Sequence, residues 1–132
     1  MANHDELTGL FNRYYLFETI GRELRRAQRL QAPITIAILD IDHFKDFNDN
    51  FGHEAGDEIL RAIGGILKSS VRGSDIVCRY GGEEFVVVFF DADTLAALPR
   101  LARICETIKD TEYTCRGLPL PGDWHSTPWP LV

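Results

Sequence analysis

The sequence predicts an α/β (α+β) fold in a single domain of 132 residues. Three stretches carry apolar residues every three to four positions, which is the pattern of amphipathic helices. Short runs rich in β-branched residues lie between them, which is the pattern of buried strands. The pair Gly81-Gly82 separates two of these runs and predicts an antiparallel hairpin. Together these patterns favour a sheet with helices packed on it.

The first helix is expected from Asn12 to about Gln31, because apolar residues recur there at helical spacing with charged residues between them. Pro33 ends this helix. The run Ile34 to Leu39 is almost wholly apolar and predicts a central, buried strand. Asp40-Ile41-Asp42 closes the strand, so two carboxylates stand at its end.

A polar stretch with helical character then leads to Gly52, and a second helix is expected from about Glu54 to Val71. Gly64-Gly65 inside it costs about 1 kcal/mol per glycine relative to alanine. We attribute the pair to close packing on the sheet. The hairpin follows, with strands from Asp75 to Tyr80 and from Glu83 to Phe90 and a two-residue Gly-Gly loop at positive φ.

A third helical pattern runs from Thr94 to Lys109, and Pro99 predicts that the helix begins at that proline. The composition changes after about Cys115, since four of the six prolines and both tryptophans lie between Pro119 and Val132. We therefore divide the chain into a domain over residues 1–115 and an atypical tail over residues 116–132. The tail shows no apolar period, and we expect no strand in it.

Charge and hydropathy exclude several classes of function. Lys plus Arg total 14 against 20 Asp plus Glu, giving a net charge of −6, which argues against a DNA- or RNA-binding protein. The longest apolar runs have six residues, so no transmembrane segment and no direct membrane contact are expected. The N-terminus lacks a secretory signal, and a cytoplasmic protein is the expectation. The three cysteines are expected to be buried or partly buried free thiols.

Four acidic residues form the candidate site. Asp40 and Asp42 end one strand, and Glu83 and Glu84 begin another directly after the glycine pair. If the two strands are neighbours, these carboxylates converge and repel one another unless a cation lies between them. Hard oxygen ligands of this kind suit Mg²⁺ or Mn²⁺. The alternative is that the acids are simply solvated at the ends of their strands.

The segment Arg79-Tyr80-Gly81-Gly82-Glu83-Glu84-Phe85 resembles the signature hairpin of GGDEF-domain diguanylate cyclases, in the variant with Glu at the third position. Three further segments of that family agree in order and spacing. They are Asp5-Glu6-Leu7-Thr8-Gly9-Leu10-Phe11-Asn12-Arg13, Asp40-Ile41-Asp42-His43-Phe44-Lys45, and Asn48-Asp49-Asn50-Phe51-Gly52-His53 continuing to Gly56-Asp57. The resemblance runs from Asp5 to about Ile108.

The resemblance implies a palm-like nucleotidyl-cyclase fold with a central, mostly antiparallel sheet flanked by helices. It implies a bacterial signalling enzyme that condenses two GTP molecules into cyclic di-GMP and pyrophosphate, with one GTP held by each subunit of a homodimer. The family's metal ligands correspond to Asp40, Glu83 and the backbone carbonyl of Ile41, and Glu84 stands beside them. The glycines, Gly81 and Gly82, leave room for phosphates. Two-metal phosphoryl transfer is the implied chemistry.

The same carry-over gives the substrate and product sites. Asn48 and Asp57 resemble the guanine-binding residues, and Lys45 resembles a phosphate contact. Arg72 and Asp75 match the family's RxxD product-inhibition site, five residues before the glycine pair. Each also has an ordinary interpretation: a turn residue for Asn48, a surface or first-turn helix acid for Asp57, and a surface ion pair for RxxD.

The C-terminus departs from the family. The strand and the helix that carry its phosphate-holding Lys and Arg are not recognisable, and both elements are expected to be missing; a truncation or frame change near Gly122 is our hypothesis. The missing strand is expected to leave an open sheet edge. The alternatives to an active cyclase are therefore a catalytically inactive module that binds cyclic di-GMP or GTP, and a defective fragment with neither activity.

Overall fold

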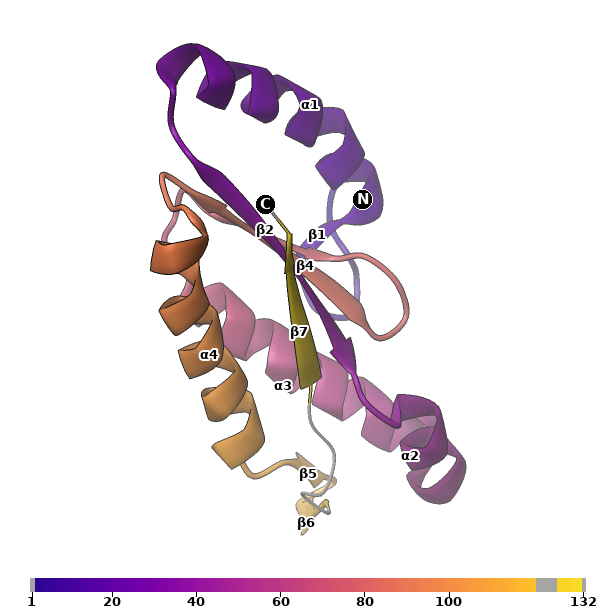
Figure 1. Cartoon of the computed structure of the whole chain (residues 1–132). Coiled ribbons are helices and arrows are strands. Elements are labelled where there is room, and N and C mark those ends of the chain that lie inside the picture. Colours follow the sequence, from indigo (N-terminus) through magenta and orange to yellow (C-terminus); the bar gives the residue numbers. More distant parts are fainter. Residues whose placement is uncertain (1, 121–125, 132) are drawn as a thin grey trace.

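The computed structural model describes residues 2–120 and 126–131 and contains a five-stranded sheet with helices on both faces (Figure 1). The strands are β1 (Phe11–Asn12), β2 (Ile34–Ile41), β3 (Ile76–Arg79), β4 (Glu84–Phe90), β5 (Thr114–Cys115), β6 (Leu118–Pro119) and β7 (Ser126–Leu131). The helices are α1 (Arg13–Leu30), α2 (Phe44–Phe51), α3 (His53–Ser70) and α4 (Thr94–Asp110). The predicted fold class is confirmed.

The sheet order is β1-β3-β4-β2-β7, and every pairing is antiparallel except that of β1 with β3. A small hairpin of β5 and β6 stands apart from this sheet. The centre is formed by β2 and β4, whose register pairs Ile34 with Phe90 and Asp40 with Glu84. The apolar, β-branched residues of these strands suit a position buried on both faces.

Alternate residues of the strands supply two hydrophobic cores. Toward α3 and α4, Leu39, Val87 and Phe89 are almost fully buried. Toward α1, Cys78, Val86 and Val88 pack with Leu16. In Figure 1, α1 accordingly lies on one side of the sheet and α3 and α4 on the other. Burial raises the pKa of Cys78 to about 12, and all three cysteines are free and at least partly buried, as predicted.

Two local predictions are wrong. The glycine pair is not a two-residue turn with positive φ: β3 ends at Arg79 and β4 begins at Glu84, so the loop has four residues, and neither Gly81 nor Gly82 has positive φ. The third helix does not begin at Pro99. It begins at Thr94, because the Asp93 side chain caps it by accepting from the Ala96 N–H, and Pro99 is tolerated inside.

The tail also differs from expectation. Residues 126–131 form β7, which pairs along β2 from Ile36 to Ile41, so the expected open edge beside β2 is occupied. We expected the family's C-terminal strand to be missing, but a strand with a different sequence occupies its position in the sheet. Among the described residues, α4 is the last helix. Residues 121–125, around the hypothesised frame change, lie outside the described residues.

Gly64 has a packing role, but its neighbour is not the sheet. A Cβ at Gly64 would lie 3.1 Å from the Cβ of Thr8 and 3.5 Å from Leu10, so the N-terminal turn sits on α3 at this glycine. A Cβ at Gly65 would meet none of the described residues within 4 Å. Close packing therefore explains one glycine of the pair.

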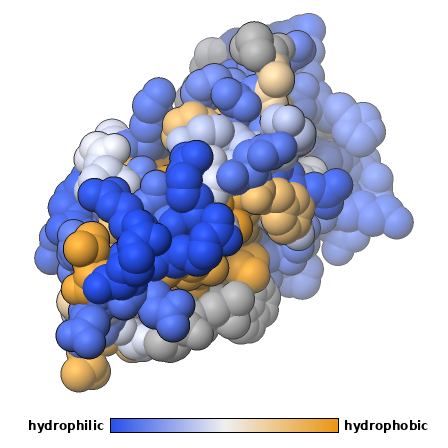
Figure 2. Space-filling model, turned by 90° about the horizontal axis from the view of Figure 1, so that it is seen from above, coloured by the Kyte–Doolittle hydropathy of each residue, from blue (hydrophilic) through white to orange (hydrophobic). Residues whose placement is uncertain are grey.

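The molecular surface on the α1 side is mainly hydrophilic, with separate small hydrophobic patches (Figure 2). Exposed apolar side chains of α1 include Tyr14, Phe17 and Leu30. None of the helices in the described part of the chain combines the length and the apolar character needed to cross a bilayer.

Candidate functional site

The acidic residues of β2 and β4 meet at one end of the central strand pair. Asp40 is directly opposite Glu84 in the antiparallel register. The Ile41 N–H donates to the Glu83 carbonyl at 3.2 Å, which extends this pairing into the loop of residues 80–83 between β3 and β4, called the glycine loop. The predicted convergence of the two strand ends is therefore present in the backbone itself.

Electrostatics at this point favour a bound cation. The pKa of Glu83 is raised by burial, by the charges of Asp40 and Glu84, and by a hydrogen bond with Asp40. Asp40 Oδ1 is buried without a hydrogen-bond partner among the described residues. A buried carboxylate oxygen that lacks a donor is costly, and a cation between the acids would satisfy it while removing their mutual repulsion.

The side chains alone do not enclose an ion: the described part of the chain has no group of three acidic, histidine or cysteine side chains arranged to hold a metal. The family's ligand set has only two acidic side chains, at Asp40 and Glu83, and adds a backbone carbonyl, at Ile41. This donor set is hard and oxygen-only, and it fits Mg²⁺ or Mn²⁺ with water or phosphate completing the coordination.

The glycine loop brings Glu84 against its own backbone. The N–H groups of Tyr80 and Gly81 both donate to the Glu84 carbonyl, at 2.8 and 3.3 Å. A Cβ at Gly81 would lie 2.5 Å from Glu84 Oε1. Gly81 is therefore needed for the carboxylate to occupy this place, whereas a Cβ at Gly82 would point into open space.

A second glycine makes room for the predicted guanine contact. A Cβ at Gly56 in α3 would lie 1.9 Å from Asn48 Oδ1, so Asn48 of α2 fits only because position 56 has no side chain. Asn48 Oδ1 is buried without a hydrogen-bond partner among the described residues. Asp57 follows Gly56 in the first turns of α3 and is half-buried, and Lys45 is exposed on α2.

The RxxD residues sit at the start of β3, and their two side chains differ sharply in environment. The Asp75 side chain is fully buried, while that of Arg72 is 52% exposed, and Arg72 Nε lies 3.6 Å from Asp75 Oδ2. Asp75 accepts from the backbone N–H of Arg72 and of Phe90 and from the Arg100 guanidinium. Burial works to raise the pKa of Asp75, but these hydrogen bonds outweigh it and the pKa is lowered.

Three structural partners were missed from the sequence. Arg100 in α4 binds Asp75, Gly56 accommodates Asn48, and Asp5 binds Arg79 beside the glycine loop. Arg79 and Asp5 are 74 positions apart, so no periodic pattern relates them. A single clue was in the sequence, since both residues belong to motifs already quoted for the family resemblance.

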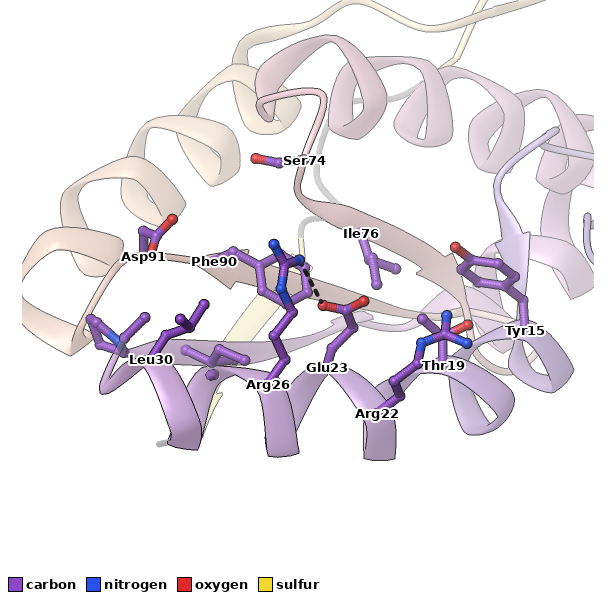
Figure 3. Close-up of a pocket in the computed structure, with 14 residues that line it drawn as sticks. Tyr15, Thr19, Arg22, Glu23, Arg26, Leu30, Ser74, Ile76, Phe90 and Asp91 are labelled. Carbon is purple, nitrogen blue, oxygen red and sulfur yellow. Dashed lines mark ion pairs between the residues drawn. The ribbon is translucent and has the colours of Figure 1, made fainter.

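A cavity of about 450 Å³ lies between α1 and the sheet, at the opposite end of β2 and β4 from the acids (Figure 3). Its lining includes Arg22 and Arg26 of α1 and reaches Ile34, Phe90 and the RxxD loop at Ser74. Figure 3 shows Arg26 paired with the neighbouring Glu23 on the same helix. None of the predicted site residues lines this cavity.

Comparisons with known proteins agree with the geometry. Residues 2–119 match the family described as "Diguanylate cyclase, GGDEF domain". The chain is 42% identical over 116 residues to diguanylate cyclase DgcP of Pseudomonas aeruginosa, a match that covers 88% of this chain and 17% of that protein. It is 45% identical over 114 residues to response regulator PleD of Caulobacter vibrioides, covering 86% of this chain and 25% of that protein. The chain thus spans a quarter or less of these relatives.

Solved structures show the same fold. The GGDEF domain of DgcB from Caulobacter crescentus, determined in complex with c-di-GMP, superposes with a TM-score of 0.92 at 29% identity, covering 98% of this chain and 77% of that one. Diguanylate cyclase SiaD from Pseudomonas aeruginosa, determined in complex with its activator SiaC, gives a TM-score of 0.89 at 32% identity, covering 96% and 48%.

Proposed function

The chain belongs to the GGDEF-domain family of diguanylate cyclases, and from that membership we propose that it condenses two GTP molecules into cyclic di-GMP. In each half-reaction a 3′-hydroxyl oxygen bonds to the α-phosphorus of the other GTP, and the bond from that phosphorus to the β-phosphate oxygen breaks. Pyrophosphate leaves, and the hydroxyl proton passes to a base. The observation that carries this proposal is the meeting of Asp40, Glu83 and Glu84 at the glycine loop.

Asp40, Glu83 and the Ile41 carbonyl are proposed to hold Mg²⁺ or Mn²⁺. The raised pKa of Glu83 supports this, as does Asp40 Oδ1, which has no hydrogen-bond partner among residues 2–120. When bound, such an ion neutralises phosphate charge and acidifies the attacking hydroxyl. Glu84 Oε1, which lies over Gly81, is proposed as the acceptor of the hydroxyl proton.

Substrate recognition is assigned to α2 and the start of α3. Asn48 Oδ1 is a buried acceptor that finds no partner within the described part of the chain, and a guanine amino group supplies the donor it needs. Asp57 is proposed to accept from guanine N1–H, and exposed Lys45 to contact a phosphate. No described residue lies within 4 Å of the place where a Gly82 side chain would stand, which suits a phosphate passing over the loop. Gly81 serves indirectly, by admitting Glu84.

Because each site is proposed to hold one GTP, product formation requires two copies of the chain face to face. Activity per subunit should therefore rise with protein concentration. A specific activity that stays constant on dilution far below the dimerisation constant would contradict the two-half-site arrangement.

Product inhibition is proposed at the RxxD loop, with Arg72 as the residue that contacts cyclic di-GMP. Its guanidinium is the exposed partner of the pair, whereas the Asp75 carboxylate is committed to three donors within the fold. Asp75 is thus better suited to orienting Arg72 than to reading guanine. Calorimetric titration with cyclic di-GMP should show at least about tenfold weaker binding for Arg72→Ala, and equal affinities would place the product site elsewhere.

A second candidate function is a module that binds cyclic di-GMP or GTP without turnover. The observation that favours it is the sequence of β7 (Ser126–Leu131), which contains no Lys or Arg. On either function, a domain over residues 1–115 with a tail over residues 116–132 is proposed, and the tail contributes β7 to the sheet.

One experiment separates the two functions. The purified chain is incubated with GTP and Mg²⁺, and cyclic di-GMP and pyrophosphate are quantified, with Asp40→Ala and Glu83→Ala as matched variants. The cyclase predicts product from the parent alone, and loss of Mg²⁺-dependent GTP binding in both variants. Binding of nucleotide without product supports the module, and unchanged Mg²⁺-dependent GTP affinity in both variants refutes the metal assignment.

A further inference from the structure

Arg79 connects the tip of the glycine loop to a distant part of the chain. Its Nη1 lies 3.2 and 3.3 Å from the two carboxylate oxygens of Asp5, and its Nη2 donates to the Gly82 carbonyl at 2.8 Å. The Arg79 and Asp5 side chains are only 18% and 20% exposed, so this ion pair is largely shielded from solvent. One guanidinium therefore joins the N-terminal turn to the loop that precedes Glu83 and Glu84.

The anchor for this contact is itself rigid. Asp5 Oδ2 accepts from both the N–H and the hydroxyl of Thr8, and the Asp5 backbone bonds to Gly9 and Leu10. Thr8 in turn packs against Gly64 of α3. Burial works to raise the pKa of Asp5, yet the hydrogen bonds from Thr8 and Arg79 outweigh it and the pKa is lowered. Asp5 is thus a charged residue held in place by its own turn.

Backbone hydrogen bonds hold the base of the glycine loop, whereas a side-chain hydrogen bond holds its tip. The N–H groups of Tyr80 and Gly81 bond to the Glu84 carbonyl and close the base of the hairpin. The Gly82 carbonyl, next to Glu83, is held by Arg79. Glycine at positions 81 and 82 makes this loop intrinsically mobile. A charge-assisted hydrogen bond from Arg79, which is itself held by Asp5, restricts that freedom at the tip.

We propose that Arg79 is a positioning residue, which fixes the Gly82 carbonyl against Asp5 and thereby holds the Glu83 and Glu84 carboxylates in their reacting arrangement. The inference rests on the proposed cyclase function, since it assigns a catalytic consequence to the bridge. The three groups are called here the Asp5–Arg79–Gly82 bridge. Through this bridge, a displacement of residues 3–12 changes the position of the glycine loop.

The bridge requires arginine. A guanidinium presents several donors in a fixed fork, so it can serve a carboxylate with one nitrogen and a carbonyl with another. A lysine ammonium carries the same charge but cannot span both partners in this geometry. Arg79→Lys therefore removes the bridge while keeping the positive charge, which separates positioning from a direct role of Arg79 in attracting phosphate.

A rival explanation comes from the cavity beside the bridge. It has a volume of about 390 Å³ and is lined by Arg13, Arg79, Gly81 and Gly82, among others. An anion in this cavity would meet Arg79 directly, and Arg79 would then act by binding substrate rather than by holding the loop. The two explanations differ in what Asp5→Asn does, because Asp5 has no attraction for an anion.

The first arm of the test measures hydrogen exchange of the loop amides and needs no catalytic activity. Asp5→Asn and Arg79→Lys are compared with Arg116→Lys, which disrupts an exposed bidentate ion pair with Glu54 away from the loop. In both bridge variants we expect exchange over residues 81–84 to accelerate at least about tenfold, the loss of one charge-assisted hydrogen bond. Exchange in α3 and α4 should stay at the parental rate. Unchanged loop exchange in both variants overturns the proposal.

The second arm measures steady-state kinetics with GTP and Mg²⁺. Positioning predicts that both bridge variants lose at least about tenfold in kcat with little change in KM, as expected when only the reacting arrangement is disturbed. A rise in KM for an Arg79→Ala variant that neither Asp5→Asn nor Arg79→Lys reproduces would make Arg79 a substrate ligand and overturn the positioning role. If the parent forms no product, the proposed function fails, and the exchange arm still decides whether the bridge holds the loop.

Discussion

Replacing Asp75 by asparagine should destabilise the whole domain, although the residue belongs to a motif assigned to product binding. The carboxylate is fully buried and accepts from the Arg72 N–H at 3.0 Å, the Phe90 N–H at 3.1 Å and Arg100 Nη2 at 2.9 Å. Asparagine offers one oxygen and turns an NH₂ group toward at least one of these donors. At roughly 1.5–3 kcal/mol per hydrogen bond to a charged group, we expect a loss of about 2–4 kcal/mol.

Urea denaturation monitored by circular dichroism measures this loss as a lower midpoint at an unchanged m-value. Glu54→Gln is the matched control, because Glu54 also receives two hydrogen bonds from one arginine, Arg116, but its side chain is 56% exposed. The control should lose no more than about 1 kcal/mol. A loss in Asp75→Asn that equals the control would refute the view that Asp75 is a structural anchor.

The same carboxylate predicts the response to acid. The pKa of Asp75 is lower in the folded protein than in the unfolded chain, so its contribution is complete above the unfolded value near about 3.9 and is lost as the pH falls through the folded value. Thermal denaturation between pH 6 and pH 2 should show a steeper decline for the parent than for Asp75→Asn. Parallel declines would contradict this assignment.

Three further predictions concern the acids and the glycines. Folding raises the pKa of Glu83, so the charged carboxylate opposes folding at pH values above its unfolded pKa. Without metal, Glu83→Gln should therefore have a higher melting temperature than the parent at pH 7, and the difference should shrink toward pH 4. Equal melting curves would contradict the repulsion between the acids. Gly81→Ala should displace the flexible Glu84 carboxylate and lower kcat at least about tenfold, while the melting temperature stays near that of the parent. Full activity would show that Glu84 works from another position. Gly65→Ala should stabilise α3 by about 0.5–1 kcal/mol, whereas Gly64→Ala should not, because the new Cβ meets Thr8. Chemical denaturation of the two variants measures this difference, and equal changes in stability would contradict the packing role of Gly64.

The sequence was sufficient for the elements whose signal is local. The apolar run from Ile34 onward predicts β2, although the strand continues to Ile41, so Asp40 lies within the paired strand rather than after it. The helix after Asp93 shows the limit of a local rule, because α4 begins at the aspartate cap and continues through Pro99. Likewise the glycine pair predicts a hairpin correctly but not its loop, whose length is set by the Glu84 carbonyl that accepts from two N–H groups.

The candidate site was predictable as a set of residue types but not as a set of contacts. The acids could be placed together because strand pairing determines their register. Long-range polar partners carry no such pattern: Arg100 reaches Asp75 from α4, and Asp5 lies 74 positions before Arg79 in the chain. The contribution of these contacts to stability depends on how deeply they are buried. The burial of a single polar side chain depends on the complete fold rather than on its neighbours in the sequence.

The two outermost strands of the sheet limit how copies of this chain can associate. At one margin, β1 offers only two residues for pairing. At the other, β7 carries Pro128 and Pro130, and proline is accommodated in a border strand when its nitrogen faces away from the neighbouring strand. Short borders and borders interrupted by proline resist the addition of a further strand. Continuous cross-β growth is thereby discouraged, and the proposed contact between two copies is left to loops and helices, including the loops at the ends of β2 and β4.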